Sequence, residues 1–174
     1  MALRRALASD GWRTFPWDGG LNLGARADTV EMLKARLDAI SPDQPVLVVG
    51  WSLGGIFARA LALAYRERVR AVVTLGSPFS GDAKSNNVWR LYEWIAGHKV
   101  DDPPIPRDPS KPAVPSLSIW SPKDGIVSPR SARGLDEESD RIVALHCSHM
   151  AFGVSRRTAD RVVREIDTFL KSHD

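Results

Sequence analysis

One ten-residue segment, Val46–Gly55 (VLVVGWSLGG), constrains the fold of this chain more than any other feature. Its first four residues are continuously apolar and mostly β-branched, which is typical of a strand buried on both faces of a parallel sheet. The residues that follow the glycines are rich in alanine and predict a helix. The chain therefore passes from strand to helix through a tight, strained turn with Ser52 at its tip.

The turn has the pattern G-x-S-x-G, with glycine at positions 50 and 54. We expect side chains at both positions to collide in such a turn, so that each must be glycine. Ser52 then lies at a helix N-terminus, whose dipole favours negative charge, and the backbone N–H of Leu53 becomes a candidate oxyanion donor. Two alternatives are a glycine-rich turn with an incidental serine and a dinucleotide-binding loop. The second needs G-x-G-x-x-G, and here Ser52 occupies the place of the second glycine.

Hydrophobic periodicity predicts strands and helices that alternate along the rest of the chain. Further buried strands are expected at 69–75, 117–120 and 141–145, a short strand at 12–17, and helices at 2–8, 28–40, 53–65 and 158–170. Apolar strands that alternate with helices favour an α/β fold, a mostly parallel sheet covered by helices on both faces.

Residues 81–115 interrupt this alternation. A short helix is expected at 87–95, and six prolines follow between Pro103 and Pro115. We therefore expect a single domain over 1–174 in which 81–115 is an insertion. Its helix either covers the sheet or forms a cap over a pocket.

Composition excludes several classes of function. The 174 residues carry 24 Lys and Arg against 21 Asp and Glu, a net charge of +3, without any run of five basic residues, so we expect no nucleic-acid partner. No apolar stretch approaches the roughly 20 residues that cross a bilayer, and no signal peptide is evident, so we expect a cytoplasmic protein. The single cysteine, Cys147, excludes an internal disulfide and a cysteine-cluster zinc site, and we expect no metal or organic cofactor.

A serine hydroxyl becomes a good nucleophile when a base takes its proton and an acid orients that base. Such groups gather at the carboxyl ends of parallel strands. Asp124 follows the strand expected at 117–120, and His149 follows the one expected at 141–145. His146 is the competing base, but it lies closer to its strand, and we favour His149.

The remaining candidates are assigned no chemistry. We expect His98 and His173 to be solvated, and the acidic residues at 136–140 to form a solvated surface loop. Cys147 has no turn of its own like the one at Ser52, so a thiol nucleophile is not expected.

With the chain order Ser52, Asp124, His149, the sequence resembles the α/β-hydrolase family over nearly its whole length, 2–170. The segment LGSPFSG at 75–81 also looks like a loop of lipase-like and esterase-like members. The resemblance implies that Ser52 attacks a carbonyl carbon, that His149 acts as base and then acid, and that Asp124 holds the imidazole. We therefore expect a serine hydrolase that cleaves a small-molecule carboxylic ester or thioester through an acyl-enzyme. The candidates for an apolar substrate pocket are Trp51, Phe79, Trp89 and Tyr92.

The sequence departs from the family at its N-terminus. The resemblance implies further strands and a His-Gly or Pro-Gly-type loop with the second oxyanion donor before residues 2–8, where only Met1 stands. It also implies that one absent strand lies between those at 12–17 and 46–49, which leaves a slot in an N-terminally truncated sheet. Three explanations stand: a fragment or misassigned start, a shift of 12–17 to pair with 46–49, or a strand from a second chain in an oligomer. The in-frame DNA upstream of Met1 tests the first.

The absent loop also motivates an alternative function. A non-catalytic module with this fold would bind an apolar ligand or a protein partner instead of turning over an ester.

Overall fold

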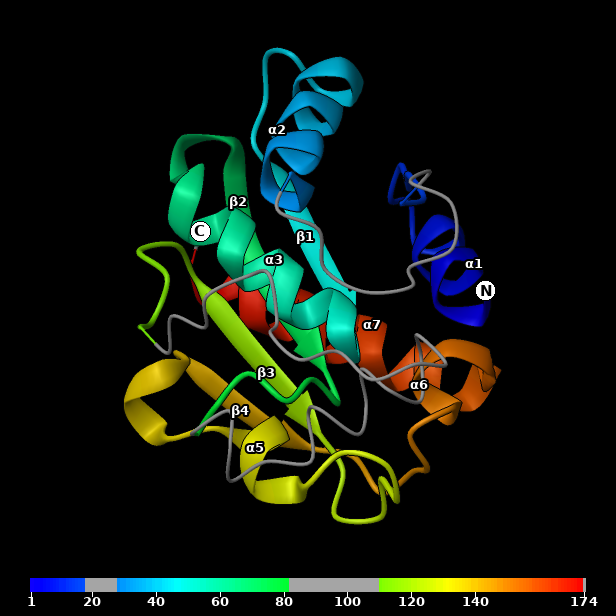
Figure 1. Ribbon diagram of the computed structural model, residues 1–174. Coiled ribbons are helices and arrows are strands. Elements are labelled where there is room, and N and C mark those ends of the chain that lie inside the picture. Colours follow the sequence, from blue (N-terminus) through cyan, green and yellow to red (C-terminus); the bar gives the residue numbers. More distant parts are fainter. Residues whose placement is uncertain (18–27, 82–109, 174) are drawn as a thin grey trace.

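The computed structural model describes residues 1–17, 28–81 and 110–173. In this part of the chain four parallel strands form one sheet in the order β1-β2-β3-β4 (Figure 1). The strands are β1 (Val46–Trp51), β2 (Val69–Leu75), β3 (Ser116–Trp120) and β4 (Arg141–Ala144). Because all four run in one direction, their carboxyl ends meet at the same edge of the sheet. The predicted α/β class with a parallel sheet is confirmed.

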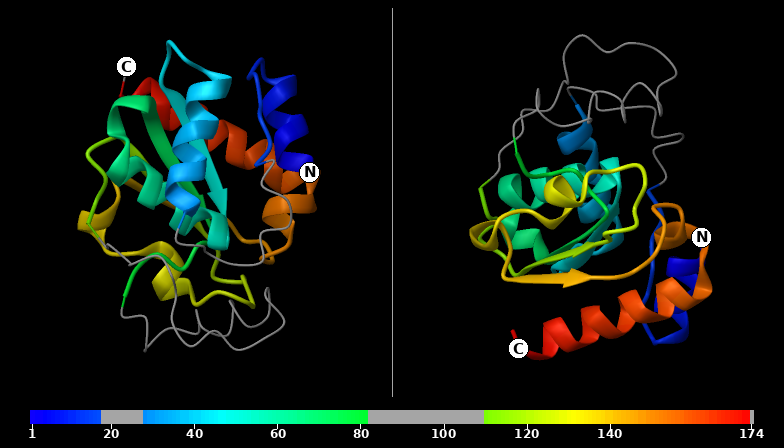
Figure 2. Two further views of the ribbon diagram at one scale, coloured as in Figure 1. Left: turned by 45° about the horizontal axis from the view of Figure 1, so that its top comes forward. Right: turned by 90° about the horizontal axis from the view of Figure 1, so that it is seen from below.

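Helices cover both faces of this sheet (Figure 2). One face carries α1 (Ala2–Ser9) and α7 (Arg156–Lys171), and the other carries α2 (Thr29–Ile40) and α3 (Leu53–Ala64). The short elements are η1 (Arg66–Arg68), α5 (Pro129–Arg133), η2 (Asp136–Glu138) and α6 (Ala151–Val154). Within the described ranges, no helix is both long enough and apolar enough for a membrane span.

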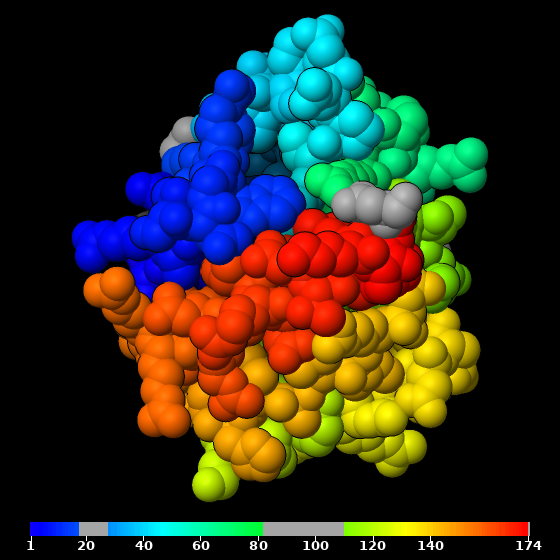
Figure 3. Space-filling view, turned by 180° about the vertical axis from the view of Figure 1, so that it is seen from behind, coloured from blue at the N-terminus to red at the C-terminus, as the bar shows by residue number. Residues whose placement is uncertain are grey.

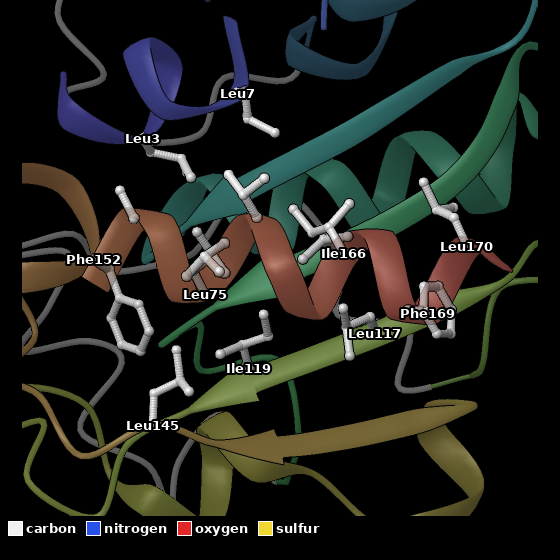
Figure 4. Packing of buried hydrophobic residues seen from close by; sticks show 14 of the residues in the cluster. Leu3, Leu7, Leu75, Leu117, Ile119, Leu145, Phe152, Ile166, Phe169 and Leu170 are labelled. Atoms are coloured by element: carbon white, nitrogen blue, oxygen red, sulfur yellow. The ribbon is translucent and has the colours of Figure 1, made fainter. Parts of the chain in front are cut away.

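The main core lies between the sheet and α7. Leu75, Leu117 and Ile119 project from β2 and β3 toward the helix, which meets them with Ile166 and Phe169 (Figure 4). All five side chains are at most 1% exposed. The apolar face predicted for this helix is therefore confirmed. A second cluster joins α2 and α3 to the opposite face of β2, where Leu37 and Leu61 pack near Val72.

Two predictions for the N-terminal half are wrong. The segment 12–17 contains no strand, so it does not pair with β1. The apolar residues of β1 are only half-buried, because β1 is an edge strand of the sheet in the described residues. The segment 12–17 instead continues the chain beyond the end of α1. Helix α1 itself packs along α7 on the surface shown in Figure 3.

Two carboxyl groups meet where α1 ends against α7. Burial and a hydrogen bond with Asp10 raise the pKa of Asp167 above its usual value. The folded protein then holds a proton at pH values where the unfolded chain has released it. Because its pKa is raised on folding, Asp167 stabilises the folded state at pH values below its pKa in the unfolded chain. This contribution is lost as the pH rises through the pKa of the folded state.

We therefore expect Asp167→Asn to raise Tm by about 1–3 °C at pH 7, since the amide carries no charge to repel Asp10. The gain should disappear near pH 3, where the Asp167 carboxyl is itself protonated and uncharged. Thermal unfolding followed by circular dichroism measures both values. Asp160→Asn, at an exposed position of the same helix, is the matched control and should change Tm at neither pH. A Tm gain independent of pH would contradict the assignment.

Candidate active site

Ser52 occupies the turn between β1 and α3 in a strained conformation, with φ 56° and ψ −128°. It is the only non-glycine residue with a positive φ in the described ranges. Such a backbone costs on the order of 1–3 kcal/mol and persists where the surroundings enforce it. The Ser52 N–H donates to the carbonyl of Leu75 on β2 at 2.9 Å, which fixes the turn to the neighbouring strand.

The glycines around Ser52 differ in how much space they have. A Cβ at Gly50 would lie 2.2 Å from the carbonyl oxygen of Gly54, so no side chain fits there, as predicted. The same prediction for Gly54 is wrong, because a Cβ at that position meets nothing within 4 Å. The second confined glycine is Gly55, where a Cβ would lie 1.9 Å from the hydroxyl of Ser77. The adjacent glycine pair in the sequence was the only signal for it.

Alanine at the two G-x-S-x-G glycines should therefore have opposite effects on stability. Gly54→Ala is expected to stabilise by about 0.5–1 kcal/mol, because alanine is the better helix former and the position is open. Gly50→Ala should destabilise by about 3 kcal/mol or more, since its Cβ meets backbone that cannot move aside. Urea unfolding curves measure both values, and equal shifts for the two variants would contradict this steric assignment.

Asp124 and His149 come together from the loops after β3 and β4. His149 Nδ1 lies 2.8 Å from Asp124 Oδ2, and both side chains are buried, with 2% and 0% exposure. A carboxylate accepts hydrogen bonds, so Nδ1 is the donor of this bond, and in the tautomer that donates from Nδ1 the acceptor is Nε2. The other carboxylate oxygen, Oδ1, accepts the N–H groups of Ile126 at 3.0 Å and Val127 at 2.6 Å. The backbone thus fixes the acid, and the acid fixes the imidazole.

Ser121 joins the two loops and was missed by sequence reasoning. Its buried hydroxyl donates to the carbonyl of Cys147 at 2.6 Å and accepts the N–H groups of Lys123 at 3.0 Å and Cys147 at 3.1 Å. A direct backbone bond, from His149 N–H to the Asp124 carbonyl at 2.9 Å, runs parallel to it. A serine directly after a strand is too common to have indicated this role.

The Asp124–His149 pair lies beside the turn that carries Ser52. The Trp51 and His149 rings are 5.6 Å apart between centroids. Gly76 directly follows Leu75, whose carbonyl accepts the Ser52 N–H. A Cβ built at Gly76 would lie 2.8 Å from Asp124 Oδ2 and 3.3 Å from His149 Nδ1. The Ser52 hydroxyl is buried and has no hydrogen-bond partner among the described residues.

The competing candidates lie apart from this arrangement. His146 is exposed, and His173 contacts the Phe169 carbonyl near the C-terminus. Burial raises the pKa of the Cys147 thiol, which disfavours the thiolate. His98 lies outside the described residues.

The acidic loop is not wholly solvated, contrary to expectation. Glu138 is 5% exposed, and its carboxylate accepts the N–H of Leu135. Its carbonyl oxygen accepts a hydrogen bond from the buried Arg59, whose guanidinium also lies 4.2 Å from the Phe79 ring centroid. This part of the loop is therefore held in the interior.

Two of the four pocket candidates belong to the described residues. Phe79 is buried under Arg59, and the Trp51 ring packs against His149 and against Gly153, where a Cβ would lie 2.7 Å from the indole. Trp89 and Tyr92, with the rest of 82–109, lie outside the described residues. The expected cap therefore stays a prediction.

Comparison with known proteins gives a family. The family model for the alpha/beta hydrolase fold matches residues 11–108. Pimeloyl-[acyl-carrier protein] methyl ester esterase from Salmonella heidelberg is 43% identical over 58 residues, and the same enzyme from Salmonella agona matches equally. The aligned segment covers 33% of this chain and 22% of each relative, so the match spans less than a quarter of the relatives' length.

Solved structures agree on the fold. A meta-cleavage product hydrolase from Pseudomonas fluorescens superposes with a TM-score of 0.66 at 20% identity, over 92% of this chain and 77% of that chain. A methylesterase from Arabidopsis gives 0.61 at 14% identity, over 97% and 92%. The family match covers more than half of the sequence, and the parallel sheet with its helix-covered faces agrees with it. The chain belongs to the α/β hydrolase family.

Proposed function

We propose that this chain is a serine hydrolase that cleaves a carboxylic ester or thioester through an acyl-enzyme on Ser52. The observation that carries the proposal is the buried hydrogen bond between Asp124 and His149 beside the strained turn at Ser52. Burial of an imidazole with a carboxylate prepares the ring to accept a proton at its other nitrogen. The esterase name of the curated relatives agrees with this chemistry.

In the first half of the reaction, Ser52 Oγ attacks the carbonyl carbon while His149 Nε2 takes its proton. The oxyanion forms near the Leu53 N–H, which has no acceptor one turn earlier because Leu53 is the first residue of α3. The imidazolium then gives its proton to the departing alcohol or thiol, and the bond to that group breaks. In the second half, water attacks the acyl carbon while His149 takes its proton. His149 then returns the proton to Ser52 Oγ as the ester bond to Ser52 breaks, and the carboxylic acid is released.

The surroundings of the pair favour an apolar acyl group. Ile126, two residues after Asp124, is 37% exposed, and Met150, directly after His149, is 43% exposed. Exposed apolar side chains beside a polar site are typical of ligand-binding rims. Trp51 ends β1 and Phe79 follows β2, and we infer that these four apolar side chains would line a pocket for an uncharged substrate. We also infer that the reaction takes place in the cytoplasm.

A fluorophosphonate probe tests the proposal, because it phosphonylates an activated serine without needing the right acyl chain. The chain should be labelled, and Ser52→Ala and His149→Ala should not. His146→Ala, which removes an exposed histidine three residues away, is the matched control and should keep its labelling. Labelling that survives in Ser52→Ala would refute the proposal. A folded chain that takes no label would favour the alternative, a module that binds an apolar ligand or a protein partner.

A further inference from the structure

Gly76 follows the last residue of β2 and adopts a positive φ of 51°. Its N–H donates to the carbonyl of Ile119 on β3 at 2.9 Å, so its place at the end of the sheet is fixed. The direction in which a side chain would point is occupied. A Cβ would lie 2.8 Å from Asp124 Oδ2, 3.2 Å from Phe152 Cε2 and 3.3 Å from His149 Nδ1.

None of these three neighbours can move aside without disturbing the pair. Asp124 is bound through one carboxylate oxygen to two N–H groups and through the other to His149. Phe152 is 0% exposed and His149 is 2% exposed. Real Cβ atoms essentially never lie within 3.0 Å of a heavy atom of a residue other than their own and its chain neighbours, so even a methyl group at position 76 would displace the carboxylate.

The residue before Gly76 has a second role in the same place. The carbonyl of Leu75 accepts the N–H of Ser52, so adjacent residues of one strand end touch the nucleophile on one side and the Asp124–His149 pair on the other. We propose that Gly76 is a positioning residue, whose missing side chain sets the Asp124–His149 hydrogen bond in register with Ser52. Its catalytic consequence rests on the proposed function, whereas its geometric part does not.

The geometric part is tested by proton NMR of the imidazole N–H. Because the pair is buried, this proton should exchange slowly with water and give a strongly downfield resonance, which Asp124→Asn should remove. Gly76→Ala should shift or broaden it. Gly11→Ala is the matched control, since Gly11 also has a positive φ, of 92°, but a Cβ there meets nothing within 4 Å, and the resonance should stay unchanged. An unshifted resonance in Gly76→Ala would overturn the proposal.

The catalytic part is read from ester turnover. A small displacement of a catalytic group costs up to about 10²-fold in rate, so we expect Gly76→Ala to lower kcat by about 10- to 100-fold with KM nearly unchanged. Gly11→Ala should keep its kcat, which separates backbone strain from the Cβ contact. If the unmodified chain turns over no ester, the proposed function fails, and the NMR comparison still decides the role of Gly76.

A measurement on the unmodified chain covers the case in which Gly76→Ala does not fold. The α-protons of Gly76 should show a nuclear Overhauser effect to the imidazole N–H proton, since the Cβ direction points at that hydrogen bond. The α-protons of Gly11, at the end of α1, should show none. Absence of the Gly76 effect, with the imidazole proton observed, would overturn the proposal as well.

Discussion

Ser52→Ala is expected to lower kcat for ester hydrolysis by about 10⁴- to 10⁶-fold, the loss typical of a nucleophile that acts as one unit with its base. Turnover of p-nitrophenyl esters measures it. Stability should hardly change, because the Ser52 hydroxyl has no hydrogen-bond partner in the described residues and alanine meets the same backbone strain.

The matched control is Ser41→Ala, which removes a serine hydroxyl at an exposed hydrogen bond beyond α2 and should leave kcat unchanged. A kcat for Ser52→Ala above about 1% of the unmodified value would contradict Ser52 as nucleophile, since loss of a nucleophile costs far more. Equal Tm values of the two variants would show that the loss is chemical.

Asp124→Asn is expected to lower kcat by about 10⁴-fold with the fold retained. The amide oxygen can still accept the N–H groups of Ile126 and Val127, so the loop keeps its shape. The amide nitrogen, however, donates where the carboxylate accepted. His149 Nδ1 must then accept, the proton moves to Nε2, and the ring can no longer take the proton of Ser52.

Asp136→Asn is the matched control, because Asp136 is exposed and its carboxylate pairs with Arg133. Its kcat should equal that of the unmodified chain. Comparable losses in the two variants would show that the acid acts through general electrostatics, and would contradict the orienting role of Asp124.

Periodicity predicted the elements whose environment is set locally. The stretch 69–75 predicted a buried strand from its own apolar residues, and β2 has the same bounds. The apolar positions of α7 recur at helical spacing, and the helix packs on the core by that face. The same logic places Asp124 and His149 at one edge, since parallel strands share the direction of their carboxyl ends.

The errors arise where contacts are made through space. Whether β1 is central or at an edge depends on its neighbours, which its own residues do not encode. The G-x-S-x-G pattern treats Gly50 and Gly54 alike, but only Gly50 is confined, by the backbone of the helix. The second confined glycine is Gly55, where a side chain would collide with Ser77. Glu138 is buried because Arg59, distant in sequence, reaches its carbonyl. Ser121 and Gly76 likewise meet residues that are distant in sequence, Cys147 for Ser121 and the Asp124–His149 pair for Gly76.

Complete enclosure of the Asp124–His149 pair has a consequence for how the molecule responds to salt. Dissolved ions screen exposed charges over roughly 8–10 Å at physiological ionic strength but have little access to buried ones. Ion pairs at the periphery, such as Arg133 with Asp136, weaken as electrolyte is added. The Asp124–His149 contact is shielded from that competition, so added electrolyte is expected to weaken the peripheral ion pairs and to leave this hydrogen bond unchanged.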